Sequence, residues 1–200
     1  MSSHKSSPAD APARAPQRRR GELRVAALME AGAAVFAEKG YEAATMTEIA
    51  AQANAPIGSL YQFFPSKDAL ADALLVRYGE QVNSALAEIE AQAATISAAD
   101  LAASLMGLLV TRRVERATVI ALMDARGLRA SGLGLRDVMR TTVARILAAR
   151  RPELSPERAA GMAVVLVQLM KDAVVLSGEA AAGPDALDEL RRMAEIYLTV

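Results

Sequence analysis

Between residues 57 and 62 the sequence groups side chains that could contact nucleic acid. Ile57, Gly58, Ser59, Tyr61 and Gln62 are small or hydrogen-bonding, and the run contains no acid. Hydroxyl and amide groups can bond to phosphates or base edges, and an isoleucine can contact a thymine methyl group. An acidic run would be repelled by the phosphate backbone. These residue types are therefore compatible with a DNA-contacting surface.

The supply of reactive side chains excludes several classes of enzyme. The 200 residues contain no Cys and a single His, His4, which lies near the N-terminus. A disulfide framework, a thiolate nucleophile, a histidine triad and a multi-histidine metal site are therefore excluded. We expect no enzymatic activity, no cofactor and no metal. An all-α enzyme or carrier that uses Arg113, Asp124 or Lys171 stays open as an alternative.

The net charge is zero, with 23 bases and 23 acids, but the bases are not evenly spread. Six bases and two acids lie between Lys5 and Arg24, whereas residues 71–200 carry 15 bases and 16 acids. Arg18, Arg19 and Arg20 come just before the first predicted helix, where an arm could reach a minor groove. The alternative for this triplet is a solvated, generally adhesive segment.

The residues around 57–62 carry the start and stop signals of short helices. The apolar positions from Glu22 to Lys39 follow a helical period, and Gly40 is placed to end that helix in the left-handed conformation. Thr45 and Glu48 form a capping box that starts a second helix, which should stop near Asn54. Pro56 suits the first turn of a third helix, with Leu60 and Phe64 in the core. Ser66 caps a fourth helix, with Asp68 in its first turn.

The fold class predicted from these signals is all-α. Ala makes up 44 of the 200 residues, which favours helices over strands. Two short helices steadied by a third form a helix-turn-helix whose second helix fits the DNA major groove. The alternative is a small helical core without DNA contacts. Further helices are predicted at about 67–92, 98–113, 115–128, 133–150, 155–177 and 185–199, which gives about nine in total.

The same residues resemble the DNA-binding domain of the tetracycline-repressor (TetR) family. The matching runs are TMTEIA at 45–50, ANAPIGSLYQFF at 53–64 and PSKDAL at 65–70, at the expected distance from a Gly-Tyr pair that ends the first helix. The match covers about residues 20–70. It departs from the family pattern at Asn54, where Gly is usual, and at Pro56, where a capping Ser is usual. The second departure puts the start of the third helix in doubt.

The resemblance implies roles for individual residues and for the chain. It implies a ligand-responsive, cytoplasmic, homodimeric repressor that binds a palindromic double-stranded operator and is released by a small-molecule effector. A constitutive DNA-binding regulator without an effector stays open. Residues 1–17 are rich in Ser, Pro and Ala with no apolar period, which predicts a disordered tail. The resemblance implies a helix-turn-helix domain at 18–70 and an effector-binding and dimerisation domain at 71–200. The implied phosphate contacts are Thr47, Tyr61, Gln62 and Lys67, and the implied base contacts are Ile57, Gly58 and Ser59.

Two C-terminal helices are predicted to form the dimer. The stretch 155–177 is apolar on two sides, and such a helix must be covered on both. Its two predicted stripes are Met162, Val165, Leu166, Leu169 and Val175 or Leu176, and Val164, Val167, Met170 and Val174. With the amphipathic helix 185–199 it would form a four-helix interface. The alternative is a buried helix in a monomer. Lys171 and Asp172 argue against a membrane span.

An effector pocket would lie between the middle helices. Methionine fills irregular gaps and also lines adaptable pockets, so it is a weak indicator here. Each candidate could equally be an ordinary core or surface residue. The candidates are Met106, Leu109, Arg113, Met123, Asp124, Met139, Gln168 and Lys171, with Met170 and Asp172 as further possibilities.

Overall fold

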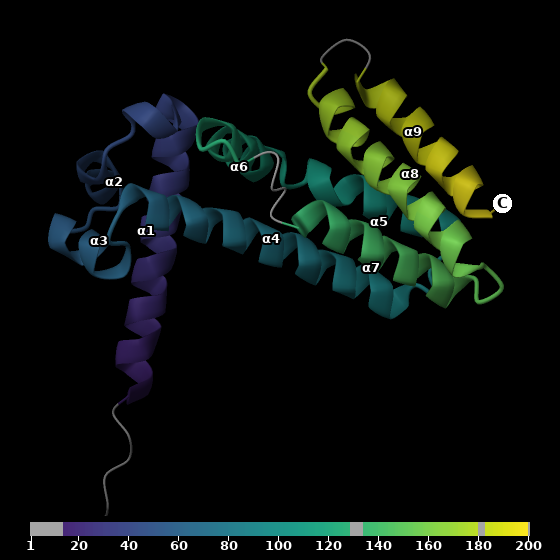
Figure 1. Cartoon of the computed structure of the whole chain (residues 1–200), viewed down its shortest axis with the longest axis horizontal. Coiled ribbons are helices and arrows are strands. Elements are labelled where there is room, and N and C mark those ends of the chain that lie inside the picture. The colour runs from purple at the N-terminus through teal and green to yellow at the C-terminus, as the bar shows by residue number, and fades with distance from the viewer. Residues whose placement is uncertain (1–13, 129–133, 180–182, 200) are drawn as a thin grey trace, which may run out of the picture.

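The computed structural model describes residues 14–128, 134–179 and 183–199. Within these ranges the chain forms nine α-helices and no strand, which confirms the predicted all-α class. The helices are α1 (Arg14–Ala43), α2 (Met46–Gln52), α3 (Ile57–Phe63), α4 (Lys67–Gln92), α5 (Ala98–Val110), α6 (Arg113–Ala125), α7 (Leu135–Arg150), α8 (Pro156–Leu176) and α9 (Gly183–Thr199) (Figure 1).

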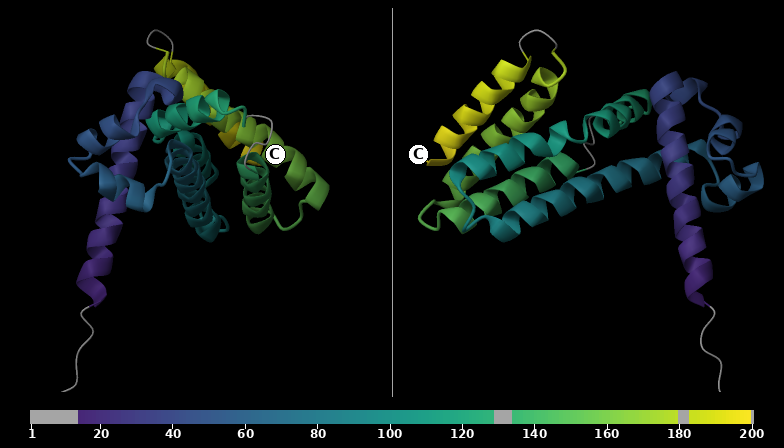
Figure 2. Two further views of the ribbon diagram at one scale, coloured as in Figure 1. Left: turned by 60° about the vertical axis from the view of Figure 1, so that its left-hand side comes forward. Right: turned by 180° about the vertical axis from the view of Figure 1, so that it is seen from behind.

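The helices form two groups that α4 joins. Figure 1 shows α1, α2 and α3 together at one end, and α5, α7, α8 and α9 as a bundle at the other. The long helix α4 runs from the first group along the bundle, and α6 lies between the groups in both views of Figure 2. Helix α6 contacts α1 of the first group and α5 of the bundle, so it is a second connection between the groups beside α4.

The first helix differs from the prediction at its start. It begins at Arg14, so residues 14–17 are helical where a disordered tail was expected. Alanine and arginine favour helices, and Pro16 lies in the first turn, where its missing N–H has no intrahelical partner to lose. Residues 1–13, including His4, lie outside the described residues.

The predicted stops of the first two helices are confirmed. Gly40 interrupts α1 where the sequence placed the stop, but its φ of 78° and ψ of 166° give a positive-φ, extended conformation and not the left-handed helical one that was expected. Beyond it, the Tyr41 ring folds back onto Phe36, with the ring centroids 5.7 Å apart. Asn54, after α2, has φ 48°, a conformation that asparagine tolerates better than most residues.

The predicted caps around α2, α3 and α4 are confirmed with one change. The Thr45 hydroxyl accepts from the Glu48 amide at 3.3 Å, and the Glu48 carboxylate accepts from the Thr45 amide at 3.1 Å. The Ser66 hydroxyl accepts from the Ala69 amide at 3.1 Å and starts α4. Pro56, however, is the N-cap of α3 and not a residue of its first turn, so α3 starts without a side-chain cap.

The first helix crosses α4 at a point of close approach. A side chain at Gly32 would place its Cβ 2.8 Å from Leu70 Cδ2, which is closer than such atoms tolerate. The absence of a side chain at Gly32 therefore lets α1 pack directly on the start of α4. The predicted domain boundary at residue 70 falls inside α4, so the start of this helix belongs to the first group and the rest to the second.

The C-terminal helices pack as a bundle in which α8 is central. It contacts α7, α5 and α9 and buries one side in its own chain. This buried side draws on both predicted stripes, so the predicted sorting of α8 into two apolar faces is wrong. It comprises Ala159, Met162, Ala163, Leu166, Val167, Met170, Ala173 and Val174. By length and hydropathy α8 is the one described helix that could cross a membrane, but a core helix passes the same test.

Candidate nucleic-acid interface and ligand cavity

The third helix presents its hydrogen-bonding residues to the surface and anchors itself through one leucine. Leu60 is fully buried, whereas Ile57 is 41% and Tyr61 49% exposed. Gly58 and Gln62 are also exposed, and Ser59 is half-buried. The structure therefore gathers the predicted contact residues of α3 on an outward surface. Thr47, in the first turn of α2, is exposed as well.

Lys67 is placed differently from the other predicted phosphate contacts. Its Nζ donates to the backbone carbonyls of Tyr41 at 2.7 Å, Glu42 at 3.0 Å and Ala44 at 3.1 Å. It also lies 4.5 Å from the centroid of the Tyr41 ring. An ammonium has three donors, and all three have acceptors here. Lys67 thus ties the end of α1 to the start of α4, and a phosphate contact would cost it one of these bonds.

The amides that open α4 offer a different anion-binding group. Ser66 accepts from the amide of Ala69, and this leaves the amides of Lys67 and Asp68, which have no acceptor within a helix. Such donors favour phosphate at a helix start. Of the arginine triplet, Arg19 and Arg20 are exposed on α1, and the backbone of Arg18 is helical. All three precede the part of α1 that packs against α2.

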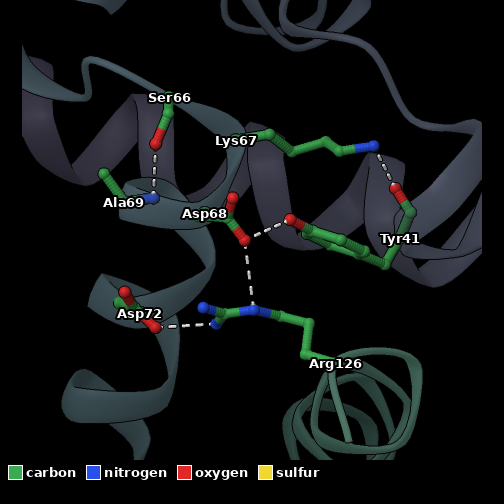
Figure 3. A network of polar contacts seen from close by, with 7 residues as sticks. All are labelled: Tyr41, Ser66, Lys67, Asp68, Ala69, Asp72 and Arg126. Atoms are coloured by element: carbon green, nitrogen blue, oxygen red, sulfur yellow. Dashed lines mark hydrogen bonds and ion pairs between the residues drawn. The ribbon is translucent and has the colours of Figure 1, made fainter.

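A polar network joins α6 to the start of α4 and the end of α1 (Figure 3). Arg126, just after α6, places its Nη1 2.7 Å from Asp72 Oδ1 and its Nε 3.3 Å from Asp68 Oδ1. Asp68 also accepts from the Tyr41 hydroxyl at 2.5 Å. The Arg126 side chain is 15% exposed, so this pair is shielded more than an ordinary surface ion pair. Burial and the hydrogen bond to Asp68 raise the pKa of Tyr41 to about 12.

A second network steadies the start of α2. Lys39, near the end of α1, donates to Glu48 Oε1 at 2.6 Å, while the other oxygen of Glu48 accepts from Thr45. The hydrogen bonds from Lys39 and then from Thr45 lower the pKa of Glu48 to about 2. The start of α2 is therefore held by the Thr45 cap and by Lys39 of α1, which meet at the Glu48 carboxylate.

A cavity of about 390 Å³ lies among α4, α5, α6, α7 and α8. Four of the eight predicted pocket residues line it: Leu109, Met123, Met139 and Lys171. Its other lining residues are Tyr78, Arg116, Val119, Ile120, Leu135, Arg136 and Val167. The cavity is thus apolar along most of its wall and carries three cations.

The other four predicted pocket residues lie elsewhere. Met106 is fully buried in the core. Arg113 donates through Nη1 to the Ser177 carbonyl at 3.1 Å, which joins α6 to the end of α8. Asp124 is exposed near the end of α6. Gln168 donates to Asp172 at 2.9 Å on the exposed side of α8. Their helices border the cavity, but their own positions on those helices face other neighbours.

Few features of the sequence mark the cavity residues that were not predicted. Tyr78, Arg116 and Arg136 come from three different helices, and none has a distinctive motif around it. Tyr78 is one of two tyrosines after residue 70, and its aromatic side chain is the one feature that could have identified it as a candidate cavity residue. Packing of α4, α6 and α7 brings these three side chains together.

Comparison with known families gives one match to this architecture. The family model described as "Bacterial regulatory proteins, tetR family" matches residues 28–74, which contain most of α1, all of α2 and α3, and the start of α4. No curated protein compared with the chain is a match. The family match thus falls on the helix-turn-helix and ends inside α4, before Tyr78, the residue of α4 that lines the cavity.

Solved structures extend the likeness to the whole fold. A TetR-family transcriptional regulator from Mesorhizobium loti MAFF303099 has a TM-score of 0.69 at 20% identity, over 90% of this chain and 95% of that one. A transcriptional regulator from Aquifex aeolicus VF5 has a TM-score of 0.68 at 17% identity, over 86% and 98%. The multidrug binding protein EbrR, solved with imidazole, has a TM-score of 0.54 at 24% identity, over 85% and 94%.

Proposed function

Through its N-terminal domain this chain belongs to the TetR family of bacterial regulatory proteins, and from this premise we propose that it is a homodimeric, ligand-responsive transcriptional repressor. It binds a palindromic operator through α3 and releases it when a small molecule occupies the cavity. It works in the cytoplasm and catalyses no reaction. We further propose the domain division 18–70 and 71–200, with α4 shared between the two.

The observation that carries the proposal is the exposed surface of α3 on a buried anchor. Leu60 fixes the helix to the core, while Ile57 and Tyr61 stand out from it. A helix of this length can enter the major groove and place its first residues against base edges. Tyr61 and Gln62 then reach phosphates, and Ser59 and Ile57 reach bases.

The dimer is supported by apolar side chains left uncovered on α8 and α9. Val164, Val165 and Val175 of α8 are exposed, as are Met193 and Ile196 of α9. The two helices pack on each other, so these side chains can form one continuous surface. A second copy related by a two-fold axis would cover it with the same surface. Such a dimer presents two α3 helices to two half-sites.

The ligand response is supported by the place of α6. Met123 and Arg116 of α6 line the cavity, and Arg126, which follows the same helix, holds Asp68 and Asp72 of α4. A ligand that shifts α6 would therefore pull on the start of α4, which follows α3 directly. The ligand must bind the DNA-incompetent state better, by about 1–3 kcal/mol for a typical coupling.

Selection of bound sequences from a random duplex library tests the DNA-binding part. We expect a palindrome with half-sites about one to one and a half helical turns apart. Tyr61→Phe should weaken binding to all operator variants alike, whereas Ser59→Ala should change the preference among them. No enriched sequence, or equal losses for both variants on every operator, contradicts the proposed roles of α3.

Sedimentation of matched variants tests the dimer. Ile196→Glu places a charge in the proposed interface and should yield a monomer with far weaker operator binding. Val114→Glu is the control, because Val114 is 66% exposed on α6, outside the proposed interface. If both variants remain dimers, or if the wild type is a monomer that binds a single half-site, the proposed interface is wrong.

A further inference from the structure

We propose that the cavity binds an amphipathic organic anion, with its charged head against Arg116, Arg136 and Lys171 and its apolar body along the rest of the wall. The inference names the chemistry of the effector and so rests on the ligand response proposed above. It concerns a property of this chain's own cavity residues, which come from α6, α7 and α8.

The charges around the cavity are all of one sign. Arg116, Arg136 and Lys171 line it, and no acid is among the described residues that do so. Of the acids next to these cations along the chain, Glu115 and Asp137 are exposed, and Asp172 is half-buried and accepts a hydrogen bond from Gln168. A cationic ligand would therefore meet repulsion at every charged group of this wall, and a neutral one would leave the three cations without a partner.

Within the described residues the three cations also differ from Arg126 and Arg145, which have carboxylate partners. Arg126 pairs with two aspartates of α4, and Arg145 binds Glu90 through two hydrogen bonds of 2.7 Å. In the part of the chain that the structure describes, the side chains of Arg116, Arg136 and Lys171 have no ion pair. Arg116 and Lys171 are half-buried and Arg136 is exposed, so an opposite charge beside the first two would be screened less than one at the open surface.

The cations lie close enough to disfavour one another's charge. Burial lowers the pKa of Lys171, and the neighbouring Arg136, Arg140 and Arg116 lower it further. Asp172 acts in the opposite direction, but its carboxylate already accepts a hydrogen bond from Gln168. Tyr78 of α4 is also buried, which raises its pKa, and the charge of Arg116 acts in the opposite direction. An anionic head between these groups would relieve their mutual repulsion.

The remaining wall fits an apolar body of modest size. Its residues are Leu109, Val119, Ile120, Met123, Leu135, Met139 and Val167. The volume of about 390 Å³ lies toward the lower end of the range of about 300–1,000 Å³ found for small-molecule sites. The first turn of α7, with Leu135 and Arg136, borders the cavity and adds the positive end of a helix dipole.

Four probes with the same ten-carbon chain separate charge from apolar contact: decanoate, decyl phosphate, decanamide and decylammonium. Calorimetric titration of the full chain without DNA should show binding of one or both anions. The amide and the ammonium should bind at least about tenfold more weakly, since a hydrogen bond to a charged group contributes about one to two decades of affinity. The stronger of the two anions identifies the head group as carboxylate or phosphate.

Charge-removing variants locate the binding site. Arg116→Met and Lys171→Met should each weaken anion binding by about tenfold while leaving decanamide unaffected. Arg158→Met is the matched control, because Arg158 is an exposed cation at the start of α8, outside the cavity. Thermal unfolding by circular dichroism confirms that each variant folds, and Arg136→Met gives a second test if one does not.

Operator binding measured on the same samples separates this inference from the proposed function. Selective anion binding that also weakens operator binding supports both. Selective anion binding by a chain that binds no operator supports the cavity assignment and contradicts the repressor. Operator binding with no anion bound at millimolar concentration, or equal binding of anion and amide, overturns the inference and leaves the DNA-binding proposal standing.

Discussion

Helix α3 and the cavity are both proposed to bind anionic groups, yet α3 has no cationic side chain and the cavity has three. Helix α3 carries no Lys or Arg, and Lys67 beside it already donates to three carbonyls. The cavity carries Arg116, Arg136 and Lys171. A DNA surface can gather many weak contacts over a long polyanion, whereas a small ligand offers one charged head. Of these two sites, the cationic side chains lie in the cavity, whose proposed ligand is much smaller than DNA.

The contrast extends to how each region is held in place. Around α3 many bonds are local caps, such as Thr45 with Glu48 and Ser66 with Ala69. The longer-range bonds of Lys39 and Lys67 also stay within residues 39–67. Around the cavity the side chains come from five helices that meet only in the folded chain. The helix-turn-helix is therefore stabilised mainly by residues of one short segment. The cavity forms only when five helices from distant parts of the chain pack together.

The largest effect is expected from removing the anchor of α3. Leu60 is fully buried, and Leu60→Ala should lower the free energy of unfolding by about 2–5 kcal/mol. Denaturant unfolding measures this loss, and operator binding should disappear with it. Anion binding to the cavity should survive at low temperature. A parallel loss of anion binding would show that the two regions do not differ in the way described.

A smaller effect is expected from cutting the link between the regions. Arg126→Met removes the ion pairs to Asp68 and Asp72 but keeps an unbranched aliphatic side chain. Operator binding without ligand should change by less than about threefold, because Asp68 and Asp72 are 65% and 60% exposed and their carboxylates stay hydrated when Arg126 is replaced. Ligand-induced release should shrink from a coupling of about 5–150-fold toward none.

Titration of operator affinity against the ligand measures this coupling. Arg145→Met is a suitable control, since it breaks an ion pair to Glu90 on the same helix α4 but far from α3. If Arg126→Met and Arg145→Met reduce the coupling equally, the path through α6 is wrong.

The smallest effect is expected on folding stability when the pH is lowered. The pKa of Glu48 is lowered to about 2 by its hydrogen bonds to Lys39 and Thr45, so the folded state binds fewer protons there than the unfolded state. This contribution to stability is present above the ordinary pKa of about 4.5 and is lost as the pH falls from there toward 2. Glu48→Gln should flatten the stability profile in that window. An unchanged profile would remove Glu48 from the account.

The sequence predicted local features well because they depend on neighbouring residues. The capping box at Thr45, the stop at Gly40 and the left-handed Asn54 were all placed correctly, since each depends on a few adjacent positions. The bounds of the later helices agree within three residues for the same reason. The early start of α1 was missed because Pro16 and the polar residues around it resemble a disordered tail.

The sequence failed where a role depends on distant partners. Lys67 was expected to be free for phosphate, but its acceptors lie at the end of α1, more than twenty residues earlier in the chain. Arg113 and Gln168 were placed in the pocket by the helices that carry them, yet their contacts lie outside it. Periodicity identifies which helix borders a cavity, but tertiary packing decides which side chain lines it.

The salt dependence of operator binding tests the central contrast most directly. If α3 and the helix-end amides supply the binding with few ionic contacts, each subunit neutralises about two to four phosphates. The logarithm of the dimer's affinity should then fall with the logarithm of salt concentration with a slope of about −4 to −7. A slope near −10 or steeper, with the same affinity for operator and random DNA, would contradict the account and assign binding to the basic N-terminal segment.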